Sequence, residues 1–154
     1  MILATQKPNA TIVPTVIRSN PLSLDTIITT NNGDKELKDL TLNDKVLGID
    51  GNWYNILSFT PIHKPRKMFE IHFSNGIVKC SDTHQWTYWD NNVNITTDTL
   101  DLFENKNYFI ENKCIFGKKE DNIILKNIKE INPIESRCII TDTPDGLFEI
   151  NTIE

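Results

Sequence analysis

The sequence predicts one all-β domain, and three observations support that prediction. Short runs rich in Ile, Val and Thr recur from residue 21 onward, a composition typical of strands. Asn-Gly and Asp-Gly pairs follow two of these runs, as expected of tight hairpins. The chain has 154 residues, 38% of them hydrophobic, which is the size of one ordinary domain with one core.

The first half of the chain is predicted to be a series of hairpins. The turn sequences NNGD, DGN and SNG separate the apolar runs. One run alternates cleanly, because Phe69, Ile71 and Phe73 would share one face of a strand. The strands expected are residues 26–30, 45–49, 54–59, 68–73 and 77–80.

The second half is less regular. One capped helical turn is expected within residues 96–103, with Thr97 or Asp98 as its N-cap. Residues 122–131 fit either a helix or a strand by spacing, and their isoleucines favour a strand. Further strands are expected at 107–111, 137–141 and 147–150. Residues 1–20 hold two prolines and no helical period, so we expect an extended arm rather than a core element.

Composition narrows the class of function. The net charge is −5 and the pI is near 5.2, so no basic surface for nucleic acid or an anionic membrane is expected. No apolar run has the length of a membrane span, and no signal peptide opens the chain. The three cysteines are widely spaced without a C-x-x-C pair, which predicts neither a disulfide framework nor a zinc site. We expect a reduced, cytoplasmic protein that needs no metal or cofactor.

The stretch IVKCSDTHQW contains the first candidate site residues. His84 follows a predicted strand, and Ser81 lies three residues before it. This histidine is either a hydrogen-bonded turn residue or a proton donor. A catalytic Cys80–His84 pair is disfavoured, because both residues lie in one short stretch without a third group to orient the imidazole. A lone strand cysteine such as Cys80 more often serves as a small buried apolar residue.

Three stretches in order resemble the sequence blocks of intein (Hint) domains. SLDTIITTNNGDKELKDLTLNDKVLGIDGN is similar to the first block, and FEIHFSNGIVKCSDTHQW to the second. RCIITDTPDGLFEI is similar to the last but one block, especially in inteins of phage large terminase subunits. Asn43 replaces a usual Gly, and Ser81 replaces a usual Thr.

The resemblance covers residues 21–154 and implies a domain organisation. Residues 1–20 would be an arm or an extein-derived segment, and residues 21–154 an intein domain. The segment between its halves is too short for a homing endonuclease, which indicates a mini-intein. The implied fold is the horseshoe-like Hint fold, built from two β-hairpin halves related by a pseudo-twofold axis.

The resemblance implies autocatalytic protein splicing, a single-turnover self-processing reaction rather than true enzymatic turnover. Its steps are an N-terminal acyl shift, a transesterification and the cyclisation of an asparagine. By motif, His84 would protonate the departing nitrogen, and Ser81 would hold the loop or bond the same amide. Cys138 stands where the family usually has Asp, and would exchange a proton at the first junction or else be a buried strand residue. Asp142 would be a turn residue, with contact to the site as the alternative.

The first splice junction presents a difficulty. If Thr26 is the sixth intein residue, the first is Pro21, and the junction is the Asn20–Pro21 bond. Proline has no nucleophilic side chain, so this register predicts no acyl shift from position 21. A shortened register would make Ser23 the nucleophile. The sequence also stops at Glu154, before the expected His-Asn pair, which predicts an inactivated or truncated precursor.

Two other functions remain open at this point. One is a non-catalytic, Hint-derived structural or binding module of a phage protein. The other is a cysteine hydrolase that uses Cys80 or Cys138 with a histidine. For the intein, the expected partners are flanking exteins in cis or a complementary split-intein fragment. We expect a monomer, encoded by a phage and located in the host cytoplasm, with no nucleic-acid or membrane partner.

Overall fold

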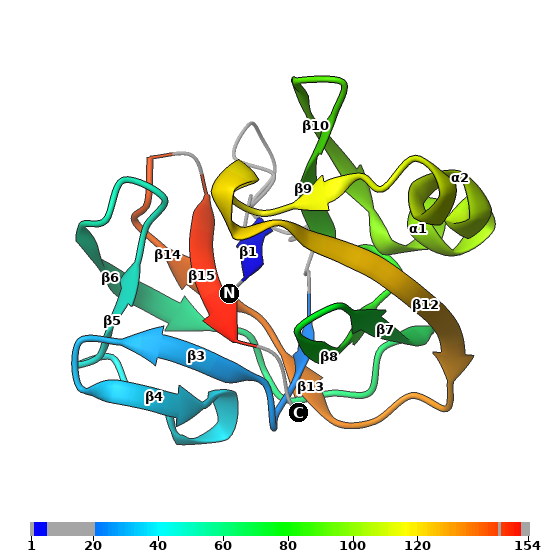
Figure 1. The fold of residues 1–154 in the computed structure, drawn as a ribbon. Coiled ribbons are helices and arrows are strands. Elements are labelled where there is room, and N and C mark those ends of the chain that lie inside the picture. Colours follow the sequence, from blue (N-terminus) through cyan, green and yellow to red (C-terminus); the bar gives the residue numbers. More distant parts are fainter. Residues whose placement is uncertain (1, 6–20, 145, 152–154) are drawn as a thin grey trace, which may run out of the picture.

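The computed structural model describes residues 2–5, 21–144 and 146–151, and strands dominate it (Figure 1). The strands are β1 (Ile2–Thr5), β2 (Leu22–Ser23), β3 (Ile27–Thr30), β4 (Gly33–Glu36), β5 (Lys45–Leu47), β6 (Trp53–Phe59), β7 (Met68–Phe73), β8 (Gly76–Ser81), β9 (Gln85–Asp90), β10 (Val93–Asp98), β11 (Ile115–Phe116), β12 (Ile123–Ile131), β13 (Ser136–Arg137), β14 (Ile139–Thr141) and β15 (Leu147–Asn151). The helices are α1 (Thr99–Glu104) and α2 (Lys106–Glu111), with 3-10 turns η1 (Leu37–Asp39) and η2 (Lys119–Asp121). The prediction of an all-β domain is confirmed.

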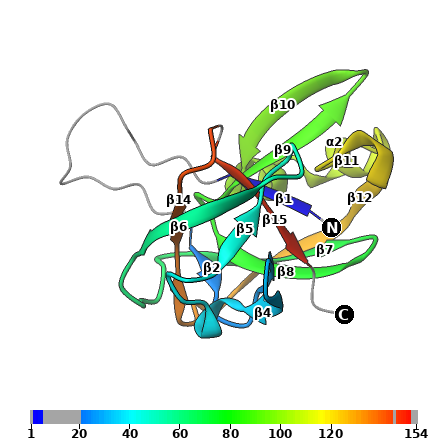
Figure 2. The same cartoon turned by 90° about the vertical axis from the view of Figure 1, so that its left-hand side faces the viewer.

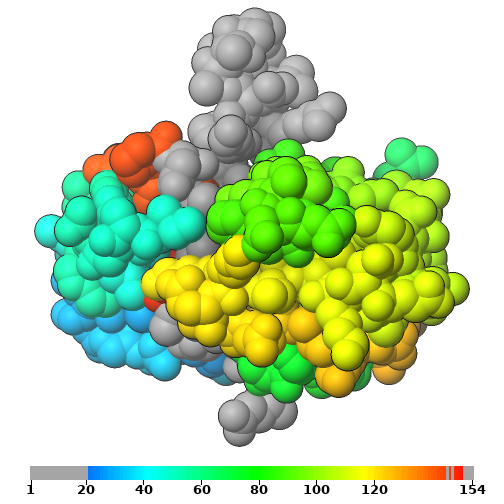
Figure 3. Space-filling view, turned by 45° about the horizontal axis from the view of Figure 1, so that its top comes forward, coloured from blue at the N-terminus to red at the C-terminus, as the bar shows by residue number. Residues whose placement is uncertain are grey.

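The strands form two lobes that lie side by side (Figures 1 and 3). We call β3 to β6 with β14 the first lobe, and β7 to β12 with both α-helices the second lobe. Hydrogen bonds link the strands in the order β13-β2-β8-β7-β12-β11-β9-β1-β15-β3-β5-β6-β14, with β10 on β9 and β4 on β3. The first lobe contains the hairpins β3–β4 and β5–β6, and the second contains β7–β8 and β9–β10 together with the antiparallel pair β11–β12. This arrangement matches the two hairpin halves that the sequence predicts.

The predicted hairpin turns of the first lobe are present. Gly33 closes the β3–β4 turn with a φ of +96°, and Gly51 lies in the β5–β6 turn with a φ of +83°. Residues with a side chain rarely adopt such positive φ values, which explains glycine at both positions. Local sequence therefore determines the register of this lobe.

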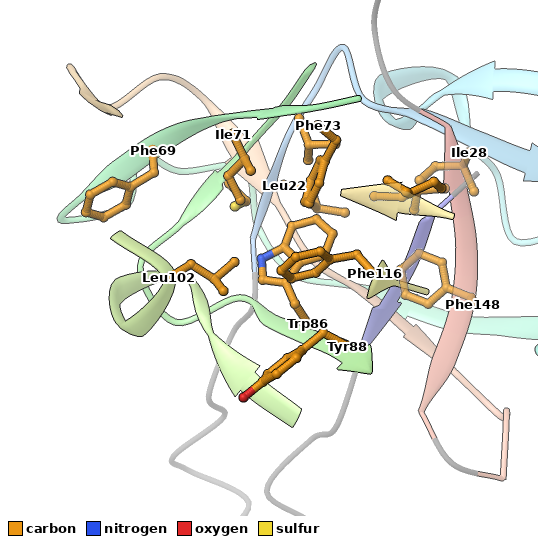
Figure 4. Close-up of a cluster of buried hydrophobic side chains, with 14 of the residues drawn as sticks. Leu22, Ile28, Phe69, Ile71, Phe73, Trp86, Tyr88, Leu102, Phe116 and Phe148 are labelled. Atoms are coloured by element: carbon orange, nitrogen blue, oxygen red, sulfur yellow. The ribbon is translucent and has the colours of Figure 1, made fainter. Parts of the chain in front are cut away.

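The core of the second lobe is aromatic (Figure 4). On β7, Phe69, Ile71 and Phe73 are buried, as their alternation predicts. The Phe73 ring lies 5.4 Å from the Trp86 ring and 5.2 Å from the Phe116 ring, measured between centroids. Tilted and edge-on contacts of this kind stabilise a core beyond simple apolar burial.

Two features of the second lobe differ from what was expected from the sequence. Residues 107–111 are not a strand but belong to α2, where Phe109 packs edge-on against Tyr88 with a centroid distance of 5.1 Å. The β9–β10 hairpin was not predicted, although Asn91 and Asn92 form its turn with positive φ values of 49° and 65°. The helical turn was predicted correctly, because the Asp98 carboxylate caps α1 by accepting the Asp101 N–H at 2.9 Å.

The N-terminal residues also differ from expectation. Residues 2–5 form β1, which pairs antiparallel with β15 on one side and with β9 on the other (Figures 1 and 2). The expectation that residues 1–20 hold no core element is therefore wrong for the backbone of these four, which belongs to the sheet, while the assignment of 1–20 as an arm or extein-derived segment stays a prediction. Residues 6–20 lie outside the described part of the chain. Within the described part, no helix has the length and apolar character needed to cross a membrane.

Candidate functional site

The two-residue strand β2 organises the candidate site. On one side Leu22 pairs with Cys80 of β8, and on the other it pairs with Arg137 of β13. Pro21, just before β2, is buried, and its C=O accepts the Ser81 N–H at 3.0 Å. Backbone pairing therefore brings position 21 close to the Ser81–His84 turn and to the chain around Cys138. Asn20, the other half of the expected junction, lies outside the described residues.

His84 is buried in the turn between β8 and β9, with 1% of its surface exposed. The backbone N–H of His84 donates to the Ser81 C=O at 3.3 Å. The backbone C=O of His84 accepts the Thr99 N–H at 3.0 Å and the Thr99 hydroxyl at 2.9 Å. The imidazole lies edge-on to Trp86, with ring centroids 4.7 Å apart. These contacts fix the position and orientation of the ring.

Thr99 and Trp86 support this turn from the core, and sequence reasoning assigned neither to the site. The Trp86 Nε1–H donates to the Thr99 hydroxyl oxygen at 2.9 Å. Trp86 is only two residues after His84, and this short separation is the signal in the sequence that could have identified it. Thr99 carries no such local signal, since its contacts depend on the β9–β10 hairpin.

The Ser81 side chain is satisfied within its own turn. Its hydroxyl shares a hydrogen bond of 3.0 Å with the Thr83 hydroxyl, and Ser81 is buried. The backbone amide of Ser81, rather than its side chain, is the group bonded to Pro21. Ser81 therefore contacts the residue after the expected junction through its main chain.

Cys138 lies between two strands that have different neighbours in the sheet. The strand before it, β13, pairs with β2, and the strand after it, β14, pairs with β6. The N–H of Cys138 donates to the Thr60 hydroxyl oxygen at 2.8 Å, and its C=O accepts the Thr60 N–H at 3.0 Å. The residue is buried, with 3% exposed, and its thiol lies 3.8 Å from the Ile139 carbonyl oxygen. Cys138 thus follows directly after Arg137, a partner of β2.

Cys80 has a different environment. Burial raises the pKa of its thiol to about 12, although the Thr99 hydroxyl, 3.4 Å from the sulfur, opposes that rise. A cysteine reacts as the thiolate, so a thiol with this pKa is a poor nucleophile at neutral pH. This environment disfavours the hydrolase alternative that uses Cys80.

The two minor candidates bond to neighbouring turns and strands. The buried Ser23 hydroxyl donates to the Asp25 carboxylate at 2.5 Å and shares a hydrogen bond of 3.1 Å with Thr26. Asp142 is exposed, and its carboxylate accepts the backbone N–H and the side-chain amide of Asn55 at 2.8 and 3.0 Å. Asp142 thereby fastens its loop to β6. Among the described residues, no group of three or more His, Cys, Asp or Glu side chains is arranged to hold a metal ion.

Sequence comparison finds one distant relative. No model of a protein family matches the chain. The replicative DNA helicase DnaB of Mycobacterium intracellulare is 35% identical over 66 residues. The matched region is 42% of this chain and 12% of the helicase, so the chain spans only a small part of that relative.

Structural comparison identifies the fold. The splicing domain of the Msm DnaB1 intein, solved with bound zinc, is similar with a TM-score of 0.67 and 21% identity, over 84% of this chain and 93% of that one. The gp41-1 intein has a TM-score of 0.56 and 20% identity, over 85% and 98% of the two chains. The class 3 split intein AceL NrdHF has a TM-score of 0.55 and 16% identity, over 87% and 98%. The chain therefore has the intein, or Hint, fold, while the likeness to phage terminase inteins remains a prediction.

Proposed function

We propose that residues 21–154 are an intein splicing domain, that residues 1–20 are the flanking segment, and that the Asn20–Pro21 bond is the one cleaved. The observation that carries the proposal is the position of β2 between two elements. The Ser81–His84 turn lies on one side, and Arg137 and Cys138 lie on the other. The intein fold supports this assignment, because residue 21 begins the part of the chain that the resemblance covers.

The missing side-chain nucleophile at Pro21 does not prevent cleavage if another residue supplies it. Cys138 is the thiol assigned here, because it follows Arg137, whose backbone pairs with the residue after Pro21. Its sulfur attacks the carbonyl carbon of Asn20, and a thioester forms between residues 1–20 and Cys138. The bond to the Pro21 nitrogen breaks, and that nitrogen leaves as a secondary amine. The thiol proton ends on the Pro21 nitrogen, so the step is balanced.

His84 is assigned as the group that carries this proton. Imidazole is the side chain best suited to both accept and donate a proton near physiological pH. General acid catalysis of this type contributes about 10²- to 10⁴-fold in rate. The hydrogen bonds of the His84 backbone and the edge contact with Trp86 limit its movement, which favours productive orientation.

The amide of Ser81 has the complementary role. It binds the Pro21 C=O at 3.0 Å and so fixes the residue that carries the leaving nitrogen. Later splicing steps, the transesterification and the asparagine cyclisation, remain predictions from the resemblance. Flanking exteins in cis, or a complementary fragment as in the split intein among the structural relatives, are the proposed partners.

The test is release of residues 1–20 by hydroxylamine, which cleaves thioesters. We expect intact-mass spectrometry of the purified chain to show a fragment that begins at Pro21 after treatment at pH 7 to 8. Cys138→Ala should abolish this release, and His84→Ala should slow it by about 10²-fold or more. Cys114→Ala is the matched control, since it removes a buried thiol just before β11 and should leave release unchanged.

The alternatives predict other outcomes. Release that persists in Cys138→Ala but disappears in Ser23→Ala would favour the shortened register. A chain that stays intact in hydroxylamine from pH 6 to 9 would favour the non-catalytic structural or binding module.

A further inference from the structure

We infer that Thr60 and Arg137 are positioning residues for Cys138, and that together they hold it against β2. The inference rests on the proposed function, because it concerns the thiol assigned there as the nucleophile. Its structural basis is the break between β13 and β14, where Cys138 belongs to neither strand.

Thr60 satisfies both backbone polar groups of Cys138. Its hydroxyl oxygen accepts the Cys138 N–H at 2.8 Å, and its N–H donates to the Cys138 C=O at 3.0 Å. Thr60 is itself buried, with 8% exposed, so water is a poor substitute for these contacts. The hydroxyl is essential to the arrangement, because a valine at this position would leave the Cys138 N–H without an acceptor.

Arg137 connects Thr60 to the strand that carries the junction. Its backbone pairs with Leu22, and its Nε and Nη2 atoms both donate to the Thr60 C=O, at 3.1 and 3.0 Å. The guanidinium carbon lies 4.7 Å from the centroid of the Phe59 ring, a cation–π contact that holds the planar group in place. One residue thus contacts both β2 and the threonine that binds Cys138.

The segment that lies opposite Arg137 contains one extra residue, which makes the backbone pairing irregular there. His63 and Ser136 exchange two backbone hydrogen bonds, at 3.0 and 2.8 Å, and the next contact between the two segments is the pair of hydrogen bonds that joins Thr60 to Cys138. Two residues, Pro61 and Ile62, therefore lie opposite Arg137 alone. An extra residue on one strand bends it and redirects side chains, and such bulges often lie beside active sites.

Substitutions of Thr60 test the inference directly. We expect Thr60→Val to slow hydroxylamine release of residues 1–20 by about tenfold to a hundredfold, because small displacements of a reacting group have effects of this size. Thr60→Ser keeps the hydroxyl and should stay within about threefold of the parent chain. Thr141→Val, on β14, is the matched control and should release at the parent rate.

Arg137→Lys provides a second variant that does not depend on the folding of Thr60→Val. A lysine keeps the charge but lacks the planar group whose two N–H groups donate to the Thr60 C=O. We expect its release rate to fall at least threefold. Parent rates in both Thr60→Val and Arg137→Lys would overturn the inference.

Thiol alkylation separates positioning from general destabilisation and from failure of the proposed function. Iodoacetamide labelling, followed by peptide mass mapping, gives the rate for Cys138 relative to Cys114 in the same molecule. Thr60→Val should change this ratio at least threefold, whereas a variant that is merely less stable raises both rates together. If the parent chain shows no Cys138-dependent release, the proposed function fails, and an unchanged ratio would still reject the role of Thr60.

Discussion

The two lobes are stabilised by different interactions. The second lobe buries a continuous aromatic cluster around Trp86, which is fully buried (Figure 4). The first lobe depends on a buried carboxylate, Asp44, which accepts hydrogen bonds from Asn32 and Lys35, each at 2.9 Å, and from the Thr41 N–H at 2.9 Å. Apolar burial does not depend on protonation, whereas protonation of a carboxylate removes its charge and part of its acceptor capacity and so weakens these bonds. We therefore expect acid to weaken the polar cluster around Asp44 before the aromatic core.

The lowered pKa of Asp44 reflects how strongly its neighbours favour the ionised carboxylate. Burial disfavours its charged form, but the hydrogen bonds from Asn32, Lys35 and Thr41, with the charge of Lys35, more than offset that effect and lower the pKa to about 2. The candidate site lies where both kinds of stabilisation meet. The Ser81–His84 turn rests on the aromatic core, and Cys138 is held by polar contacts at the edge of the first lobe.

The largest effect is expected from Trp86→Ala. The change removes a fully buried indole and its hydrogen bond to Thr99, and should lower the free energy of unfolding by about 3–5 kcal/mol. Urea denaturation at pH 7 and at pH 5 should show a similar loss, since no charge is involved. Trp53→Ala is the control, because Trp53 on β6 is 44% exposed and should cost about 0.5 kcal/mol or less. A loss below about 1 kcal/mol for Trp86→Ala would contradict the importance of the aromatic core.

Asp44→Asn should have the next largest effect on the free energy of unfolding, and the full effect should appear only above about pH 4. The folded pKa of about 2 lies below the unfolded value of 3.8, so the ionised carboxylate stabilises the fold above pH 4 and this contribution disappears as the pH falls to 2. The pKa shift corresponds to about 2 kcal/mol at pH 7. Denaturation curves of the parent and Asp44→Asn chains should therefore differ at pH 7 and converge near pH 2. The exposed Asp34→Asn is the control, and a difference that stays constant from pH 7 to 2 would refute the mechanism.

Much of this architecture could be predicted because its signals are local. The Asn-Gly and Asp-Gly turns and the alternation of β7 depend on neighbouring residues, and the structure confirms them. The segment 107–111 failed because its aromatic and β-branched residues favour a strand, while packing of Phe109 on Tyr88 favours a helix. β1 had no local signal at all, since its partners lie in β9 and β15.

The candidate site also has one part that could be predicted from the sequence and another that could not. The order of sequence blocks was enough to expect residue 21 near His84 and Cys138. It could not identify Thr60, whose hydroxyl binds the amide of a residue 78 positions away. Contacts of that range depend on the complete fold rather than on any motif.

Ala4→Pro tests how far the two lobes depend on each other. Ala4 is paired with Phe148 of β15 and with Trp86 of β9, so its N–H faces one of these two strands, and proline would remove that donor. We expect a loss of about 1–2 kcal/mol, the range for a broken backbone hydrogen bond with local distortion. Hydrogen exchange should become faster in β9 and β15 than in β7. Ala4→Ser keeps the N–H and serves as the control, and equal protection in both variants would show that β1 does not join the lobes.

The smallest effect concerns the two thiols that flank β2. Cys80 pairs with Leu22 from one side, and Cys138 follows the residue that pairs with it from the other. With a pKa of about 12, Cys80 is a thiolate in only about one molecule in 10⁴ at pH 8. We expect iodoacetamide to leave Cys80 unlabelled in the folded chain from pH 7 to 9 and to label it rapidly in urea. Labelling of folded Cys80 at the rate of an ordinary thiol would contradict this assignment and make Cys80, on β8, a candidate nucleophile again. If Cys80 stays inert, a thiol that reacts at residue 21 has to come from the β13 side, where the chain places Cys138.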